Sequence, residues 1–242
     1  MDKRDLAQHI SQQFNAELEK TRNTVMEMGG LVEQQLADAI TALTEGDAEL
    51  ARKVVSNDWR VNSLEVQLDE VCLHILARRQ PAASDLRLVI AVIKAISDLE
   101  RIGDESERIG RMALKLAEQG ARRHVPAELE SLGNHVRQML HDALDAFARM
   151  DVEQAVAVAR EDAKADRQYD EVVRQLLERM MGEPGSVPRV MDLIWAARSL
   201  ERIGDRACNI CEYVVYFVKG KDVRHIGIDE MAERAGYGPK RS

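Results

Sequence analysis

Leu99-Glu-Arg-Ile-Gly-Asp104 recurs in the same chain as Leu200-Glu-Arg-Ile-Gly-Asp205, at an offset of 205 − 104 = 101 residues. Upstream, Asp47-Ala-Glu-Leu-Ala matches Asp151-Val-Glu-Gln-Ala, and Asp58 matches Asp162, at an offset of 162 − 58 = 104 residues. The matching features keep their order, and the three-residue difference falls in the connection after residue 79, where insertions are tolerated. The chain therefore contains one template twice.

The first copy has the periodicity of three helices. Apolar residues at three- and four-residue spacing over residues 18–43 predict a first long helix. Gly46 breaks this helix, and Asp47 is placed to cap a second one that extends to about residue 79. A third helix is predicted over residues 81–120.

The second copy repeats this plan, with helices predicted over 126–149, 152–181 and 187–219. Asp151 is placed as an N-cap and Gly220 as a C-terminal stop. Sustained period-two alternation is absent from the sequence, and only 4% of the residues are aromatic, which disfavours β-sandwiches and barrels. We expect an all-α fold of six long helices in two pseudo-symmetric antiparallel three-helix bundles.

The repeat also predicts the division of the chain. Residues 1–120 are expected to form the first three-helix repeat and residues 121–220 the second. Residues 221–242 are polar and contain glycines, so we expect a flexible tail there.

Composition restricts the function. The formal net charge is −8 over 242 residues, which disfavours binding to nucleic acid because its phosphates repel such a chain. The polar N-terminal stretch predicts no signal peptide, and the most apolar segments are far shorter than the roughly 20 residues of a membrane span. An odd number of cysteines, three, indicates a reducing compartment, and Cys208 and Cys211 are interpreted as a buried, inert pair. We therefore expect a cytoplasmic protein.

Several carboxylates fall on helix faces that should be apolar. Stepping about 100° per residue from Ile96 places Glu100 within the apolar stripe of the third helix and Asp104 at its edge. In the last helix, Glu201 lies within the corresponding stripe and Asp205 beside it. The stripe of the third helix also includes Glu107.

The preceding helix of each half carries a matching pair. Asp162 and Asp166 share one face, while Asp58 and Asn62 begin a polar row that Glu65 and Asp69 continue. Because a partly buried, unpaired carboxylate costs several kcal/mol, a cation is expected nearby. Clustered oxygen ligands suit divalent metals such as Mg²⁺, Mn²⁺, Ca²⁺ or iron.

Two alternatives remain open at this point. Arg22, near the apolar face of the first helix, could pair with one of these acids. The carboxylates could also edge a solvated groove, where they need no partner.

Catalytic signatures are missing from the sequence. None of the six histidines follows a glutamate at the Glu-x-x-His spacing of di-iron bundles. GxxxxGK[ST], GxGxxG and GxSxG motifs are also absent. We therefore expect that the protein is not an enzyme, and we assign no catalytic residue. His74 is interpreted as an ordinary helix residue.

The duplicated Glu-Arg-Ile-Gly-Asp at 100–104 and 201–205, each preceded one helix earlier by an acid-x-x-x-acid or acid-x-x-x-amide pair, resembles the PhoU family. So does the segment Cys208-Asn-Ile-Cys-Glu-Tyr-Val-Val-Tyr-Phe-Val-Lys-Gly220. The resemblance extends over about residues 5–228. It implies two three-helix bundles related by pseudo-symmetry.

The resemblance further implies a non-catalytic regulator of phosphate homeostasis that binds metal and often dimerises. Its implied partners are the ATPase of a phosphate ABC transporter and a sensor histidine kinase, through which alone it would meet a membrane. The implied role is to repress the phosphate-starvation response. A metal-dependent phosphate-binding or storage protein is the alternative.

Carried over to this sequence, the family's metal motifs, for Mg, Mn or Fe, fall on eight positions: Glu100, Asp104, Glu201, Asp205, Asp162, Asp166, Asp58 and Asn62. Asn62 departs from the acidic pattern and removes one negative charge. We therefore expect the first-half site to hold a cation more weakly.

Overall fold

The computed structural model describes residues 3–119 and 125–237, apart from the side chains of residues 3–13, 15 and 184. Within these ranges the secondary structure is helical, without a strand, which confirms the predicted fold class. The helices are α1 (Lys3–Glu45), α2 (Ala48–Asn57), α3 (Trp59–Arg79), α4 (Ala83–Glu118), α5 (Ala127–Arg149), α6 (Val152–Gly182), α7 (Val187–Lys219) and α8 (Ile228–Ala235), with a 3-10 turn at Pro184–Ser186. In the described part of the chain, no helix has both the length and the apolarity of a bilayer span.

The helix boundaries follow from local signals. The Asp47 carboxylate accepts hydrogen bonds from the backbone N–H groups of Glu49 and Leu50, at 2.9 and 3.0 Å. Asp151 caps α6 in the same way through the N–H of Gln154. Gly220 ends α7 with a φ of +66°, a conformation that glycine adopts without strain. All three predicted signals are confirmed.

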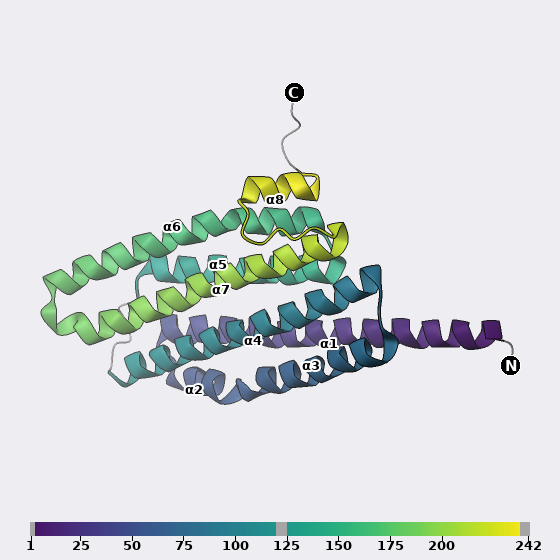
Figure 1. Ribbon diagram of the computed structural model, residues 1–242. Helices are drawn as coiled ribbons and strands as arrows, with labels where there is room; N and C mark the ends of the chain where they lie inside the picture. The colour runs from purple at the N-terminus through teal and green to yellow at the C-terminus, as the bar shows by residue number, and fades with distance from the viewer. Residues whose placement is uncertain (1–2, 120–124, 238–242) are drawn as a thin grey trace, which may run out of the picture.

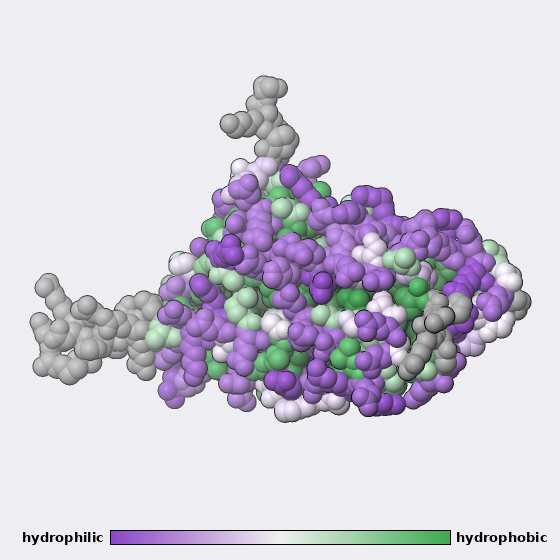
Figure 2. Space-filling model, turned by 180° about the vertical axis from the view of Figure 1, so that it is seen from behind, coloured by the Kyte–Doolittle hydropathy of each residue, from purple (hydrophilic) through white to green (hydrophobic). Residues whose placement is uncertain are grey.

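The two repeats lie one above the other (Figure 1). Helices α1 to α4 form one layer and α5 to α7 the other, and α8 lies on the outer side of α6. The layers meet where α4 packs against α7 and α1 against α5. Seen from behind, the surface is mostly hydrophilic, with separate hydrophobic patches (Figure 2).

Three features differ from the sequence prediction. The first helix, predicted over residues 18–43, begins much earlier, at Lys3. The second helix is interrupted at Asp58, where the backbone carbonyl accepts from the N–H of Val61 at 2.9 Å, a three-residue spacing that tightens the turn. The tail predicted as flexible contains α8, because Met231, Ala232 and Ala235 form an apolar face that is buried. The predicted boundary at 120/121 and residues 238–242 of the tail lie outside the described residues.

The contact between α1 and α5 is reciprocal. A Cβ added at Gly29 would lie 2.7 Å from Leu144 Cδ2, and one added at Gly133 would lie 3.2 Å from Ile40 Cγ2. Gly133 and Leu144 are the counterparts of Gly29 and Ile40 at the offset of 104 residues. Each repeat therefore places the matching glycine against the matching aliphatic position of the other repeat, Leu144 or Ile40.

The contact between α4 and α7 includes polar pairs, and these pairs are also reciprocal between the two repeats. Asp98, only 5% exposed, accepts hydrogen bonds from Arg206 Nη1 at 2.8 Å and from the Tyr213 hydroxyl at 2.6 Å. Glu105 accepts from the Ser199 hydroxyl at 2.6 Å and from Arg202 Nη1 at 3.0 Å. Because Ser199 and Arg206 are the counterparts of Asp98 and Glu105 at the offset of 101, the two repeats meet as the subunits of a two-fold dimer do.

Inside the first repeat, Gly110 of α4 allows α2 to approach closely. An alanine Cβ there would lie 2.9 Å from Val54 Cγ1 and 3.2 Å from Val54 Cβ. Valine is stiff at χ1, so the G110A variant should be destabilised by about 1–2 kcal/mol despite its better helix propensity. Urea unfolding followed by circular dichroism measures this change.

The matched control for G110A is G30A. Gly30 is also in mid-helix, but nothing lies within 4 Å of its added Cβ. This variant should gain about 0.5–1 kcal/mol from the reduced entropy of the unfolded chain. Equal effects of the two substitutions would contradict the close packing of α2 on α4.

Candidate metal centre

Helices α6 and α7 bring three predicted ligands together in the second repeat. Oxygen atoms of Asp162, Asp166 and Asp205 lie within 4.8 Å of one another. Asp162 and Asp166 lie one turn apart on α6, and Asp205 reaches them from the facing helix. Among the residues that the structure describes, this is the only such group of three potential ligands. We call Asp162, Asp166, Glu201 and Asp205 the second centre.

Glu201 borders this group and is incompletely satisfied. Its Oε1 accepts a hydrogen bond from Arg198 Nη1 of the same helix at 2.6 Å. Its Oε2 is buried and has no hydrogen-bond partner among the described atoms. A buried carboxylate oxygen without a donor is costly, so this atom indicates a positive group at the second centre.

The electrostatics of the second centre favour a cation. Partial desolvation of its carboxyl group, followed by the negative charges of Glu201, Asp162 and Asp166, raises the pKa of Asp205 to about 6, although the side chain as a whole is exposed. Burial and the charge of Asp166 raise the pKa of Asp162. Burial also raises the pKa of Glu201, although Arg198 opposes this shift. These carboxylates repel one another, and a bound cation would relieve the repulsion.

The first repeat carries Asp58, Asn62, Glu100 and Asp104, which we call the first centre, but no three of its described acids have ligand oxygens within 4.8 Å of one another. Asp58 accepts hydrogen bonds from two amides, Gln35 Nε2 at 2.9 Å and Asn62 Nδ2 at 3.1 Å. Burial raises the pKa values of Glu100 and Asp104, and the charge of Asp58 adds to both shifts. The carbonyl oxygen of Asn62 is buried without a donor, so it remains available as a ligand.

Two further acids belong to the surroundings of the first centre. Glu65 raises the pKa of Glu100, and Glu107 raises that of Asp104. Both had signals in the sequence, Glu65 in the polar row of Asp58 and Glu107 in the apolar stripe, but neither was assigned as a ligand. Glu65 adds a negative charge near the first centre, and the expectation that this centre holds a cation more weakly stays a prediction.

The alternatives to a metal can be compared with these contacts. Arg22 is exposed and makes no ion pair with these acids within the described ranges. Of the seven predicted acidic ligands, only Glu201 has an ion-pair partner among described side chains, and that arginine is on its own helix. Asp104, Asp166 and Asp205 are exposed, as a solvated rim requires, but a rim does not account for the buried Oε2 of Glu201.

The donor set at both centres fits a divalent metal. Carboxylate and amide oxygens are the ligands of Mg²⁺, Mn²⁺ and Fe²⁺ in proteins. Each centre joins two neighbouring helices of one repeat, α3 with α4 and α6 with α7.

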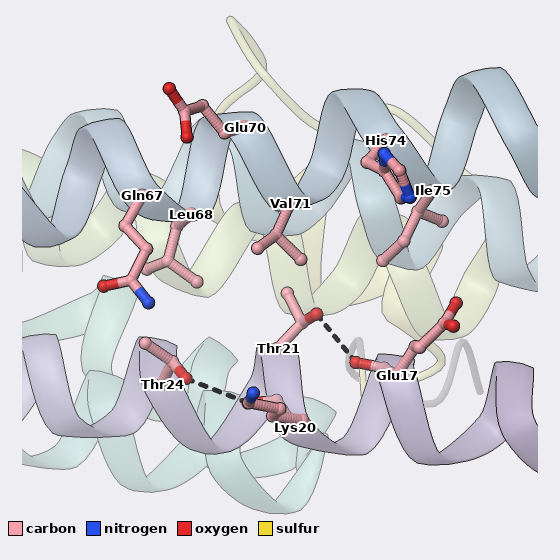
Figure 3. A pocket seen from close by; sticks show the side chains of 10 residues that line it. All are labelled: Glu17, Lys20, Thr21, Thr24, Gln67, Leu68, Glu70, Val71, His74 and Ile75. Atoms are coloured by element: carbon pink, nitrogen blue, oxygen red, sulfur yellow. Dashed lines mark hydrogen bonds between the residues drawn. The ribbon is translucent and has the colours of Figure 1, made fainter.

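A groove of about 440 Å³ lies elsewhere, between α1 and α3 (Figure 3). The hydroxyls of Thr21 and Thr24 in this groove donate to backbone carbonyls of α1, at Glu17 and Lys20. His74, interpreted from the sequence as an ordinary helix residue, lines it from α3 and is exposed. The hydroxyls are thus engaged by their own helix, and we place no site here.

Comparison with known proteins gives a consistent result. The PhoU domain matches residues 25–113 and 129–214, one match in each repeat. The phosphate-specific transport system accessory protein PhoU of Edwardsiella tarda is 55% identical over 235 residues, which cover 96% of each chain. The protein of the same name from Escherichia coli (strain K12) is 54% identical over 233 residues, 96% of this chain and 95% of the relative.

Solved structures agree with these sequence matches. The crystal structure of PhoU from Pseudomonas aeruginosa superposes with a TM-score of 0.84 at 49% identity, covering 86% of this chain and all of that one. The phosphate transport system regulatory protein PhoU from Streptococcus pneumoniae gives a TM-score of 0.80 at 30% identity, covering 87% of this chain and 99% of that one. With both repeats matched and relatives aligned over nearly its whole length, the chain belongs to the PhoU family.

Proposed function

We propose that this protein is an accessory regulator of phosphate-specific transport that carries divalent metal at both acidic centres. Its family membership supports the transport role, since relatives that match nearly the whole chain are named for that system. The orphaned Oε2 of Glu201 beside three clustered carboxylates is the observation that carries the metal role.

The proposal includes a cytoplasmic, non-catalytic adaptor. It contacts the ATPase of a phosphate ABC transporter and a sensor histidine kinase, and it represses the phosphate-starvation response while phosphate is plentiful. A homodimer is part of this proposal. The absence of catalytic motifs from the sequence supports an adaptor rather than an enzyme.

The metal would be held by Asp162, Asp166, Glu201 and Asp205 in the second centre, and by Asp58, Asn62, Glu100 and Asp104 in the first. A divalent ion held there would supply a positive charge beside these carboxylates and would link two helices of each repeat. The side chains themselves fix the spacing of those helices, since each centre takes ligands from both. A partner that contacts the helix pair would therefore meet a more rigid surface.

Complementation tests the regulatory role. In a bacterium that lacks its own family member, expression of this chain should restore repression of a phosphate-starvation reporter in phosphate-rich medium. In phosphate-poor medium the reporter should remain active. A reporter that stays active in both media, with the protein present at normal levels, would contradict the proposal.

Thermal unfolding tests the metal role. Mn²⁺ or Mg²⁺ should raise the melting temperature of the metal-free protein, because a ligand that binds only the folded state stabilises it. At a free ion concentration of 100 times Kd the gain is about 2.7 kcal/mol. A chelator should reverse the shift, and no change in either direction would favour purely structural carboxylates.

The alternative of phosphate binding or storage predicts a different result. An adaptor should retain no phosphate in equilibrium dialysis, with or without Mn²⁺. Retention that requires the metal would favour the storage function.

A further inference from the structure

Three large apolar side chains line the outer face of α3, and we call them the α3 stripe. Trp59, Val66 and Leu73 are 66%, 59% and 64% exposed. They follow one another at seven-residue spacing, so Trp59 and Leu73 each lie about 20° from Val66 around the helix. A single exposed apolar side chain is ordinary, but three in line form a continuous surface that favours a partner.

The α3 stripe is uncovered in the part of the chain that the structure describes. Helix α3 packs on α1, α2 and α4. Leu68 and Ile75, which lie about 180–200° from Val66 around the helix, are buried. In the second repeat, the corresponding helix α6 has α8 on its outer side (Figure 1). Among the described helices, none covers the outer face of α3 in this way.

The second repeat does not carry the same stripe. At the offset of 104 residues, the three positions are Ala163, Asp170 and Leu177. The exposed Asp170 puts a charge at the centre of the row. Each chain therefore offers the stripe once. A surface that is present once and pairs with its own copy gives a closed dimer, whereas two such surfaces would allow open chains.

The α3 stripe is complementary to itself. Trp59 and Leu73 are each seven residues from Val66, on opposite sides of it along the helix. In an antiparallel pair of α3 helices, Val66 of one copy therefore meets Val66 of the other on the two-fold axis. Trp59 of each copy then packs against Leu73 of the other, and a large aromatic residue paired with a leucine is a suitable anchor for an interface.

The polar residues beside the stripe fit the same arrangement. Ser63 and Glu70 flank it on one side, and Asn62 and Asp69 flank it on the other, all within about 60° of Val66. In the antiparallel pair, Glu70 lies opposite Ser63 of the second copy, and Asp69 lies opposite Asn62 of the second copy. Each carboxylate thus faces a hydroxyl or an amide, and like charges stay apart. A parallel pair would instead place Glu70 beside Glu70 and Asp69 beside Asp69, which is unfavourable.

We propose that two copies of this chain associate through α3, antiparallel and with Val66 on the two-fold axis. The homodimer belongs to the proposed function, and this inference rests on it and assigns its surface. Helix α3 has 21 residues and is therefore about 30 Å long. A single pair of such helices buries less area than a permanent dimer does, so the association should be reversible.

Cross-linking tests the position of the two-fold axis. Only an isologous contact places a residue opposite itself, so V66C should put two thiols within reach of one disulfide. With oxidised glutathione as the oxidant, the full-length V66C variant should form a covalent dimer on a non-reducing gel. The matched control is D170C, the exposed counterpart position on α6, which should remain mostly uncross-linked. Of the native cysteines, Cys72 and Cys211 are buried, and the wild type gives the background of Cys208.

Sedimentation velocity over a range of concentrations tests the strength of the association. V66D should weaken the dimer at least about 100-fold, because two carboxylates would meet on the axis. S63K should strengthen it, because the new ammonium group would face Glu70 of the second copy. L177D, the same kind of change at an exposed leucine of α6, should leave the dimer unchanged. Far-ultraviolet circular dichroism establishes that the variants are folded.

The outcomes separate this inference from the proposed function. A wild-type dimer that V66D does not weaken, without a cross-link in V66C, would overturn the role of α3 and leave the homodimer in place. A wild type that is monomeric at every concentration would overturn both the homodimer and this inference. If such a monomeric protein lost repression of the phosphate-starvation reporter through V66D, the stripe would belong to a different partner protein. Repression by the wild type tests the regulatory role independently of all these results.

Discussion

Replacing Asp98 with alanine is expected to lower the free energy of unfolding by about 3 kcal/mol, because it leaves the partly buried Arg206 and the buried Tyr213 hydroxyl without their acceptor. Arg206 would lose its carboxylate, and the Tyr213 hydroxyl and the Asn209 amide would lose an acceptor. The Asp98 side chain is only 7% exposed, so water cannot readily replace it. Urea unfolding of the metal-free protein measures the loss.

A control variant distinguishes this network from ordinary surface pairs. Glu178 pairs with Arg174 on α6 at 2.6 Å, but both side chains are more than half exposed. E178A should change stability by no more than about 0.5 kcal/mol. If D98A were equally mild, the polar contact between α4 and α7 would not be what holds the repeats together.

Replacing Asp162 and Asp205 by asparagine is expected to raise the melting temperature of the metal-free protein and to lower it, relative to the wild type, when metal is present. The pKa of Asp205 is raised to about 6 from an ordinary 3.8, and burial and like charges also raise that of Asp162. When the pKa of a carboxyl group is higher in the folded state than in the unfolded state, its contribution to stability is fully present below the pKa of the unfolded state. This contribution is lost as the pH rises through the pKa of the folded state. At pH 8 both groups therefore oppose folding of the metal-free protein, and the double variant should melt at a higher temperature than the wild type.

With Mn²⁺ the order should reverse. The wild type should gain stability by mass action, and the double variant, which lacks two anionic ligands, should not respond. Calorimetry at pH 8 and pH 5, with and without Mn²⁺, measures both effects. The response of the wild type should weaken at pH 5, where protons compete for Asp205.

The matched control is D170N, which removes one charge from an exposed position of α6 that is outside the centre. It should keep the Mn²⁺ response. A double variant that is still stabilised by Mn²⁺ to the wild-type extent would show that the ion binds elsewhere.

Most helix ends after Arg79 could be predicted to within a few residues because they depend on local chemistry, whereas the start of α1 at Lys3 could not. Asp47 and Asp151 bond to N–H groups within their own first turns, and Gly220 needs only its own backbone freedom. The break at Asp58 was missed because it involves a residue with helical dihedral angles, φ −56° and ψ −35°, that no breaker residue marks. The helix α8 was missed because its eight residues are too few for a periodic pattern to stand out.

The acidic pairs could be predicted because helical spacing places Asp162 beside Asp166 and Glu201 beside Asp205. Their partners across the bundle could not. Asp98 and Glu105 lie on the side of α4 about 180–200° from Ile96, and only the packing of α7 supplies their donors. The proximity of Cys208 to Asp162 likewise depends on how α7 is rotated against α6.

The reciprocal contacts of Gly29 with Leu144 and of Gly133 with Ile40 have a consequence for how the two halves can differ. In an assembly of two identical single-repeat chains, a cysteine introduced at one position would appear in both copies. A covalent link between the copies removes this obligation, so that Glu107 and Cys208 can occupy one position of the template in a single molecule. The tandem arrangement thus keeps the geometry of a symmetric pair while it allows each half to carry different side chains at matched positions.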